Sequence, residues 1–434
     1  MVVNVQTMRW ARLPEMLNLP AGWQLRRLLS VAQFIAGQSP DSERVNTAGS
    51  GLPFLQGCAE FADRHPVPLN WCIEPERKVD AGATLVSVRA PVGDLNRADQ
   101  SYGLGRGLGG LVAEGIDSDY LYHGMFRWRC CLQRVGQGTT FDAVTARHFA
   151  AIVVALPIQK AEQRAIAAVL DAADAAIERT RAAVVAARRL KRGLVQSLLT
   201  CGIGPDGRIR DPQRQSKEFT ATQFGTFPKS WEFVRTRGVA DVGSGVTLGK
   251  DLAGIKTIAI PYLRVANVQD GYIDTTEMKT VRVPESDVKQ YLLQTGDVLM
   301  TEGGDFDKLG RGGVWDDRIS PCLHQNHVFR VRPNQARLDP QYLSAVIAAE
   351  YGKRYFMRIA KRTTNLASIN KTQLNAFPFF LPSLKEQHRI VEILNVAESN
   401  IHAIEQASKA HERLKRGLMQ VLLTGRVRVP VGEI

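Results

Sequence analysis

The stretch Leu190-Lys191-Arg192-Gly193-Leu194 recurs as Leu414-Lys415-Arg416-Gly417-Leu418, 224 residues later (414 − 190). The same offset relates Glu162-Gln163 to Glu386-Gln387. Further pairs at this offset are Ile166 and Ile390, Leu170 and Leu394, 198–200 and 422–424, and Thr139-Thr140 and Thr363-Thr364. Because so many positions repeat at one offset, the chain is predicted to contain two copies of one structural plan.

The beginning of each copy repeats at a smaller offset. Pro20 and Trp23 correspond to Pro228 and Trp231, 208 residues later (231 − 23). Further pairs at this offset are Gly37 and Gly245, and 53–55 and 261–263. The second copy is therefore longer by 16 residues (224 − 208), and the extra length lies between the shared ends. This pattern predicts a common frame that holds two different surfaces.

Residues 160–200 and 385–424 have the spacing of long helices, with apolar or small residues at alternating steps of four and three. The first series is Ile166, Leu170, Ala173, Ile177, Thr180, Val184, Ala187, Leu190 or Lys191, Leu194 and Leu198. The second is Ile390, Leu394, Ala397, Ile401, Ile404, Ser408, His411, Leu414, Leu418 and Leu422. This is the seam of a coiled coil. We expect an antiparallel pair within the chain, about 60 Å long, that separates two globular domains; pairing between two chains is the alternative.

The ends of these helices carry local signals. Ser383 and Glu386 form a capping box, in which each side chain satisfies a free backbone amide at the helix start. The basic pairs 191–192 and 415–416 are interpreted as cations that favour the dipole at a helix C-terminus. Direct contact with phosphate is the alternative for both pairs.

The composition favours a polyanionic partner. The 56 Lys and Arg exceed the 43 Asp and Glu, giving a net charge of +13, and basic residues that neutralise phosphates release counterions. The six cysteines show no CxxC pair, which indicates reduced thiols. Residues 1–10 lack a signal-peptide pattern, and the longest apolar run, 149–156, is too short to span a bilayer. We therefore expect a soluble, cytoplasmic protein with no contact to a membrane.

Residues 20–157 and 228–382 are rich in Gly, Pro, Thr and β-branched residues, which predicts mixed α/β domains. The fold class is therefore α+β. In the first segment the glycine-rich run 103–110 suits a tight loop close to DNA, from which Arg106 projects. Arg127 and Arg129 alternate with Phe126 and Trp128, as on one face of a strand, and either contact DNA or form a solvated face.

The second segment combines two base-reading chemistries. Lys308 and Arg311 lie in a glycine-rich loop, and a polar strand His324-Gln325-Asn326-His327 follows. Arg and Lys can pair with guanine, and Gln and Asn with adenine. A buried polar network that braces the loop is the alternative. The two histidines lack further ligands nearby, so no metal site is expected.

Catalytic motifs are missing. A PD…ExK-like pattern at 40–41 and 76–78 has widely separated halves and no match in the second copy. The sequence has no Walker motif and no Asn-Pro-Pro-Tyr/Phe element of amino-methyltransferases. We therefore expect a DNA reader with no catalytic residues, no bound metal and no cofactor of its own.

The arrangement resembles the specificity subunit of type I restriction-modification enzymes over nearly the whole chain. The motifs that carry the resemblance are Pro-x-Gly-Trp at 20–23, Pro-Phe-Leu at 53–55, the Thr-Thr pairs, Leu-Pro followed by Glu-Gln at 156–163 and 381–387, Leu-Lys-Arg-Gly-Leu, and the stretches 105–107, 307–312 and 324–327. Ser230 departs from the pattern, because the first copy has Gly22 there.

The resemblance implies two target-recognition domains, each reading half of a bipartite double-stranded DNA site, and a helix pair that sets the spacing with an internal pseudo-twofold repeat. Two methylation subunits, which bind S-adenosylmethionine, would dock on the helices and methylate adenine, and two ATP- and Mg-dependent restriction subunits would complete the nuclease. The expected limits are 1–157 and 202–382 for the domains, 158–201 and 383–424 for the helices, and 425–434 for a tail.

The predicted DNA-binding residues are Arg106, Arg127, Arg129, Arg264, Lys308, Arg311, His324, Gln325 and Asn326. The predicted partner-binding residues are Leu190, Leu194, Leu414 and Leu418. Two alternatives remain open: a specificity subunit of a related system whose methylation and cleavage functions share one chain, and a coiled-coil scaffold that does not bind DNA.

Overall fold

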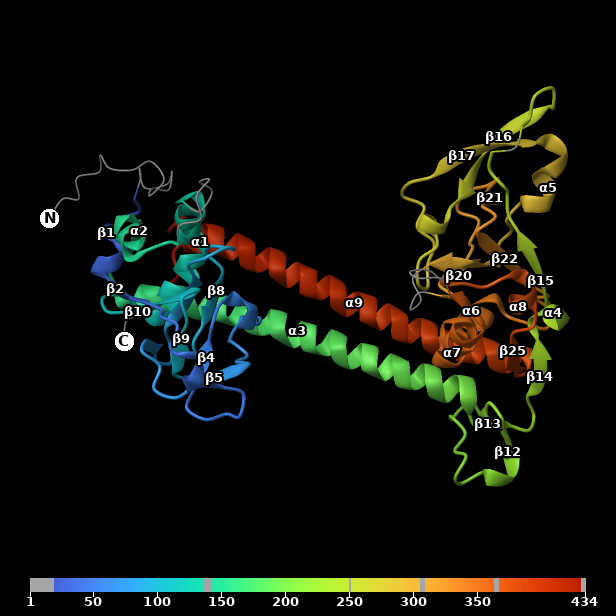
Figure 1. Ribbon diagram of the computed structural model, residues 1–434, viewed down its shortest axis with the longest axis horizontal. Helices are drawn as coiled ribbons and strands as arrows, with labels where there is room; N and C mark the ends of the chain where they lie inside the picture. Colours follow the sequence, from blue (N-terminus) through green and yellow to red (C-terminus); the bar gives the residue numbers. More distant parts are fainter. Residues whose placement is uncertain (1–18, 136–142, 250, 305–308, 363–366, 431–434) are drawn as a thin grey trace. The chain divides into compact units, whose positions relative to one another are not determined.

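The computed structural model describes residues 19–135, 143–249, 251–304, 309–362 and 367–430. It divides into two compact units (Figure 1): unit 1 comprises residues 1–183 and 404–434, and unit 2 comprises 184–403. Each unit contains one globular half and a part of each long helix, α3 (Lys160–Thr200) and α9 (Leu384–Leu422). The prediction of a mixed α+β protein with a pair of long helices is confirmed, while the predicted domain limits stay predictions.

Unit 1 is built on an antiparallel four-stranded sheet in the order β2 (Ala32–Ala36), β10 (Leu108–Ala113), β7 (Thr84–Ser87), β8 (Leu95–Arg97). Helix α1 (Ser118–Val135) packs against β7, β8 and β10 and buries Trp128. A second sheet has the order β3 (Val45–Asn46), β5 (Asn70–Cys72), β4 (Leu52–Leu55), β9 (Tyr102–Leu104), β6 (Lys78–Val79). The remaining elements are β1 (Trp23–Arg27) paired with β11 (Val153–Pro157), α2 (Ala146–Ala151), η3 (Leu28–Ser30), η4 (Ser42–Arg44) and η5 (Cys58–Glu60).

Unit 2 repeats this plan with additions. Its four-stranded sheet has the order β15 (Ala240–Ser244), β22 (Val328–Pro333), β18 (Val298–Thr301), β20 (Gly312–Val314), and α6 (Pro340–Ala348) packs against β18 and β20. A three-stranded sheet has the order β17 (Lys279–Pro284), β16 (Thr257–Leu263), β21 (Leu323–His324). The other elements are β12 (Phe219–Thr222), β13 (Gly225–Pro228), β14 (Glu232–Arg235), β25 (Pro378–Leu381), α4 (Thr236–Val239), α5 (Val288–Tyr291), β19 (Gly303–Gly304), α7 (Glu350–Ile359), β23 (Lys361–Arg362), β24 (Ala367–Ser368), α8 (Lys371–Asn375), η6 (Ser216–Glu218), η7 (Val265–Asn267) and η8 (Glu285–Asp287).

The long helices bury much of the predicted seam. Ile166, Leu170 and Ile177 of α3 are buried, as are Ile390, Leu394 and Ile401 of α9. In unit 1 the residues of the two helices pair in opposite chain directions, since Asp174 binds Lys415 at 2.5 Å and Arg181 binds Glu412 at 2.8 Å. In unit 2, Lys191 pairs with Glu398.

The repeated lysine, and not the leucine before it, faces the neighbouring helix. Leu414 was expected on the seam but is 57% exposed, and Leu190 is 65% exposed. Lys191 and Lys415 make the ion pairs described above instead. Lys191 also lies more than two turns before the end of α3 at Thr200, so the interpretation of this basic pair as a cap of the helix dipole is wrong.

The expected capping box at the start of α9 forms only in part. The Glu386 backbone amide donates to the Ser383 hydroxyl at 3.4 Å, as expected. The Glu386 carboxylate instead binds Arg210 and the Ile203 amide. Among the residues that the structure describes, no helix is both long and apolar enough to cross a membrane.

Candidate nucleic-acid interface

In unit 1 a tight turn, residues 105–107 (turn 1), joins β9 to β10 and presents Arg106. The Gly105 amide donates to the Leu55 carbonyl at 2.8 Å, and the Gly107 amide donates to the Gln56 carbonyl at 3.3 Å. A Cβ on Gly107 would lie 2.6 Å from the Gln56 carbonyl oxygen, so this close approach requires glycine. The backbone therefore fixes turn 1 against the end of β4.

Turn 1 carries a guanidinium, an amide and a hydroxyl side by side. The exposed Arg106 donates from Nε to the Ser39 hydroxyl at 2.9 Å. The exposed Gln56 donates from Nε2 to the same hydroxyl at 3.4 Å. Ser39 thereby holds two side chains that can each pair with a base edge.

In unit 2 the turn formed by residues 325–327 (turn 2) joins β21 to β22 in the same way. The Gln325 amide donates to the Leu263 carbonyl at 2.9 Å. Leu263 pairs with His324 in parallel strands, as Leu55 pairs with Leu104 in unit 1. The strand that follows each turn holds the second place in a four-stranded sheet: β10 lies between β2 and β7, and β22 lies between β15 and β18. Gln325, Asn326 and His327 therefore occupy the positions of Gly105, Arg106 and Gly107.

Turn 2 offers polar groups with unused hydrogen-bonding capacity. The side chains of Gln325 and Asn326 are partly exposed and make no hydrogen bond with another residue that the structure describes. Arg264 follows β16 as Gln56 follows β4, and its Nη2 donates to the Glu277 carboxylate at 3.2 Å. Its buried Nε has no partner among the described residues. Turn 2 thus brings together three of the predicted residues.

Arg311 lies apart from turn 2. It precedes β20, which is two strands from β22 in the sheet order, and its Nη1 donates to the Gln269 side chain at 3.4 Å. Its buried Nε has no partner among the described residues. Lys308, predicted beside it, lies outside the described residues.

His324 does not face solvent. It is fully buried, and its Nδ1 donates to the Val328 carbonyl at 2.7 Å across turn 2. Burial lowers the pKa of His324 to about 4, although the bond to Val328 opposes this. These facts support the alternative in which His324 braces the turn. Only Leu323 and His324 form a strand, so the polar strand predicted over 324–327 is wrong: its last residues turn the chain.

The His324 side chain predicts a loss of stability in acid. The folded state holds the imidazole neutral to about pH 4, whereas an unfolded histidine takes up a proton near pH 6.5. Stability that is complete above pH 6.5 therefore falls as the pH drops toward 4, by about 2 kcal/mol at pH 5. His324→Leu, which installs the residue type of the equivalent Leu104, should remove this part of the pH dependence. Urea unfolding of both proteins at pH 7 and pH 5 measures it; equal acid losses would contradict the prediction.

Arg127 and Arg129 lie in helix α1, so the predicted strand is wrong here. Alternation suggested a strand, but Trp128 is buried in the core, and successive helix positions turn by about 100°. The Arg129 guanidinium lies 5.3 Å from the centre of the Phe126 ring. The two arginines therefore do not share one outward face, and their contact with DNA stays a prediction.

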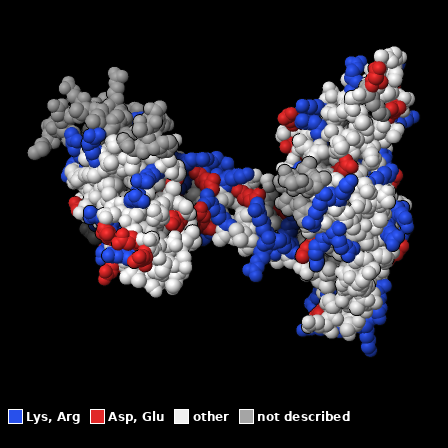
Figure 2. All heavy atoms as spheres, in the orientation of Figure 1, with Lys and Arg blue, Asp and Glu red and all other residues white. Residues whose placement is uncertain are grey.

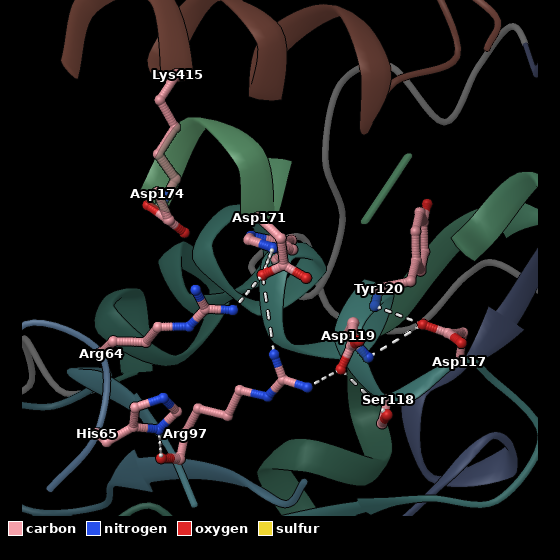
Figure 3. Close-up of polar contacts among 11 residues, drawn as sticks. Arg64, His65, Arg97, Asp117, Ser118, Asp119, Tyr120, Asp171, Asp174 and Lys415 are labelled. Carbon is pink, nitrogen blue, oxygen red and sulfur yellow. Dashed lines mark hydrogen bonds and ion pairs between the residues drawn. The ribbon is translucent and has the colours of Figure 1, made fainter. Parts of the chain in front are cut away.

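An ion-pair network joins the globular part of unit 1 to helix α3 (Figure 3). Asp171 of α3 accepts from Arg64 at 2.7 Å and from the fully buried His123 at 3.2 Å, and Arg97 lies 3.8 Å away. Burial raises the pKa of Asp171, but the His123 hydrogen bond and the arginines outweigh it and lower the pKa overall. This network fixes the loop that carries Arg64, the end of strand β8 and helix α1 on helix α3.

The same cluster has the geometry of a metal site but not its charge balance. Ligand atoms of His123, Asp171 and Asp174 lie within 4.8 Å of one another. Asp171 is already paired with two arginines, and Lys415 binds Asp174 at 2.5 Å (Figure 3). A cation would have to displace these partners, so we assign the cluster to structure.

The repeated Glu-Gln pair lies in the first turn of each long helix, and its Glu binds an Arg and a Trp. In unit 2, Glu386 accepts from Arg210 at 2.6 Å, the Ile203 amide at 2.8 Å and Trp231 at 3.4 Å. In unit 1, Glu162 accepts from Arg428 at 2.5 Å. We call each group, a Glu with its Arg and Trp, a clasp; the unit 1 clasp includes Trp23, which donates to Glu162 at 3.3 Å.

The glutamine next to each clasp is also buried. Gln163 donates to the Pro157 carbonyl and accepts from the Asp117 amide, both at 2.8 Å. Gln387 donates to the Pro382 carbonyl at 2.9 Å and accepts from the Asp339 amide at 2.8 Å. The Glu-Gln repeat therefore ties each helix start to the globular part of its own unit.

Comparison with known proteins matches the family model "Type I restriction modification DNA specificity domain" to residues 20–187 and 228–412. The two matched regions cover most of the chain, one in each copy. The chain belongs to the type I restriction-modification DNA specificity family. This confirms the prediction of a DNA specificity component that is not itself an enzyme.

Two relatives come from Methanocaldococcus jannaschii. A protein assigned as the specificity subunit of the type I restriction enzyme MjaX is 36% identical over 212 residues, covering 48% of this chain and 49% of that protein. The MjaVIII specificity subunit is 24% identical over 322 residues, covering 72% of this chain and 71% of that protein. The first alignment thus spans about half of its relative.

Two solved structures share the fold. The S subunit from M. genitalium has a TM-score of 0.56 at 14% identity, with 94% of this chain and 97% of that chain covered. A chain from a study of complex assembly in a type I restriction-modification system has a TM-score of 0.52 at 18% identity, with 94% and 100% covered.

In this specificity protein the predicted partner-binding leucines divide into two kinds. Leu190 and Leu414 are largely exposed, whereas Leu194 and Leu418 pack against the cores of unit 2 and unit 1. The first pair is accessible at the surface, and its binding to a partner stays a prediction. The second pair is only partly buried, and each of its leucines packs on the core of its own unit.

Sequence reasoning missed several residues of the specificity protein. Ser39 and Gln56 belong to turn 1, but no motif marks them. Arg210 and Arg428 complete the clasps, yet they lie 218 residues apart (428 − 210), which matches neither repeat offset. A glycine follows each long helix, Gly202 in the first copy and Gly425 in the second, and each precedes one of these arginines. These glycines were the feature of the sequence that could have pointed to the two arginines.

Proposed function

We propose that each unit reads one half of a bipartite double-stranded DNA site, unit 1 through turn 1 and unit 2 through turn 2. The observation that carries this proposal is that equivalent turns present different polar side chains, Arg106 in one and Asn326 in the other. Two domains that recognise different DNA sequences require this arrangement, in which the backbone of the turn is the same and its side chains differ. Arg pairs with guanine and Asn with adenine in the major groove.

The charge distribution supports binding to the DNA backbone. On the visible face of unit 2, Lys and Arg side chains form larger patches than Asp and Glu, although other residues cover most of it (Figure 2). The chain carries a net charge of +13. Scattered cations contribute affinity and position the protein, while a few side chains supply specificity. Binding should therefore weaken steeply with added salt.

The proposed role of α3 and α9 is that of a spacer. They would form an antiparallel coiled coil along their full length, with an internal pseudo-twofold repeat that offers the same surface to two copies of one partner. Leu190 and Leu414, exposed at equivalent positions, are the best-placed residues for two methylation subunits. Two restriction subunits would complete the enzyme.

In this proposal the chemistry belongs to the partners. S-adenosylmethionine would bind the methylation subunits, and ATP with Mg²⁺ the restriction subunits. The cytoplasmic location stays a prediction.

Arg311→Ala is expected to weaken recognition at one half-site only, because Arg311 belongs to unit 2. Although Arg311 lies apart from turn 2, it would add a contact of unit 2 outside that turn, and the loss of one base contact should cost about 1–3 kcal/mol of discrimination. Binding of the assembled complex to duplexes with one half-site altered at a time measures this. Arg179→Ala is the control, since Arg179 is exposed on α3 in unit 1. An equal loss at both half-sites would contradict the assignment.

A further inference from the structure

Each turn gathers an arginine, a side-chain amide and a hydroxyl, but the positions of the arginine and the amide are exchanged between the two units. In unit 1 the amide, Gln56, follows the parallel strand, and the arginine, Arg106, lies in the turn. In unit 2 the arginine, Arg264, follows the parallel strand, and the amide, Asn326, lies in the turn. The strand registers that define these positions agree in both units.

The third member of the set is a hydroxyl. Ser39 lies one residue after Gln38, whose amide donates to the Leu104 carbonyl at 2.8 Å. Thr247 lies one residue after Val246, whose amide donates to the His324 carbonyl at 2.7 Å. Each unit therefore places one hydroxyl beside its turn by the same backbone bond.

From this exchange we infer that each unit reads one guanine and one adenine. The residue in the turn reads guanine in unit 1 and adenine in unit 2, and the residue after the parallel strand reads the other base. Arg106 contacts guanine and Gln56 adenine in the first half-site; Arg264 contacts guanine and Asn326 adenine in the second. The inference rests on the proposed function and adds the base contacted by each of four named residues. It uses the pairing of Arg with guanine O6 and N7, and of Gln or Asn with adenine N6 and N7.

The surroundings of the four side chains fit this assignment. Glu277 holds Arg264 through Nη2, leaving Nη1 without a hydrogen bond to a described residue, so Glu277 acts as a positioning residue. Gln56 and Arg106 are both exposed and are held by the Ser39 hydroxyl. Asn326 is partly exposed, and its side chain makes no hydrogen bond with a described residue.

The test exchanges the two chemistries within one unit. The double variant Gln56→Arg/Arg106→Asn gives unit 1 the order of unit 2, and Arg264→Gln/Asn326→Arg gives unit 2 the order of unit 1. Each variant is co-expressed with its methylation partner, and the methylated motif is mapped across the host DNA. Co-purification and thermal unfolding establish that each complex is assembled and folded.

We expect each double variant to change base preference at two positions of one half-site and to leave the other half unchanged. Binding to the original half-site should fall about 10- to 100-fold. Arg106→Lys should keep guanine, since Lys also pairs with it, and this single variant keeps the inference testable if a double variant fails to fold. Arg179→Asn, which removes one exposed charge from α3, should leave the motif intact.

The outcomes separate the inference from the function beneath it. A wild-type motif retained by both folded double variants overturns the base assignments while the specificity function stands. Changes in the same half-site from both variants also overturn them. If the wild-type chain directs no motif in an assembled complex, the proposed function fails and the inference fails with it.

Discussion

The double variant Leu394→Asp/Ile401→Asp is expected to lose the folded helical part of unit 2. Both side chains are buried, 8% and 5% exposed, and Leu394 belongs to the main core of that unit. Placing two unpaired carboxylates in apolar surroundings should cost more than about 5 kcal/mol, which approaches the whole stability of a typical domain. Circular dichroism and urea unfolding measure the loss.

Val396→Asp is the matched control for this variant. Val396 lies on the same helix but is 57% exposed, so a carboxylate there stays in water. The control should unfold close to the wild type and still assemble with its partners. A double variant with the wild-type unfolding midpoint would show that the seam does not stabilise unit 2.

Glu386→Ala is expected to destabilise unit 2 by about 3–5 kcal/mol, because it leaves the Arg210 guanidinium without its carboxylate. The Arg210 and Glu386 side chains are only 10% and 11% exposed, so water screens the pair little. The clasp is also tight: a Cβ on Gly202 would lie 2.2 Å from Glu386 Oε1. Denaturant unfolding of the full chain measures the effect.

The equivalent change in unit 1 provides the comparison. Glu162→Ala removes the same group, but Arg428 is 46% exposed and can be solvated once it is released. We therefore expect a smaller loss from Glu162→Ala than from Glu386→Ala. Equal losses from the two variants would mean that burial of the arginine does not set the strength of the clasp.

The internal repeat and the helical periodicity were sufficient to predict those parts of the fold that depend on nearby residues in the sequence. The four-three spacing located both long helices, because an amphipathic helix must bury one stripe. The same reasoning could have placed α1, since Leu121, Met125, Trp128 and Leu132 are buried at helical spacing. Attention to Arg127 and Arg129 alone suggested a strand instead.

The equivalence of the two turns was beyond reach of the sequence. Arg106 and Asn326 lie 220 residues apart (326 − 106), an offset between those of the repeat ends, and the two turns share no residue type. Only the strand register reveals their common position. The sequence could not decide between DNA contact and a buried brace for His324 for a related reason: a polar residue type does not show whether the side chain is buried until its partner, the Val328 carbonyl, is located.

The most direct test of the account is to co-express this chain with its methylation partner and to map methylated bases across the host DNA. Two units that read independently predict a bipartite motif with a fixed gap, absent when this chain is omitted. One contiguous motif, or methylation that does not depend on this chain, would contradict the assignment of one half-site to each unit.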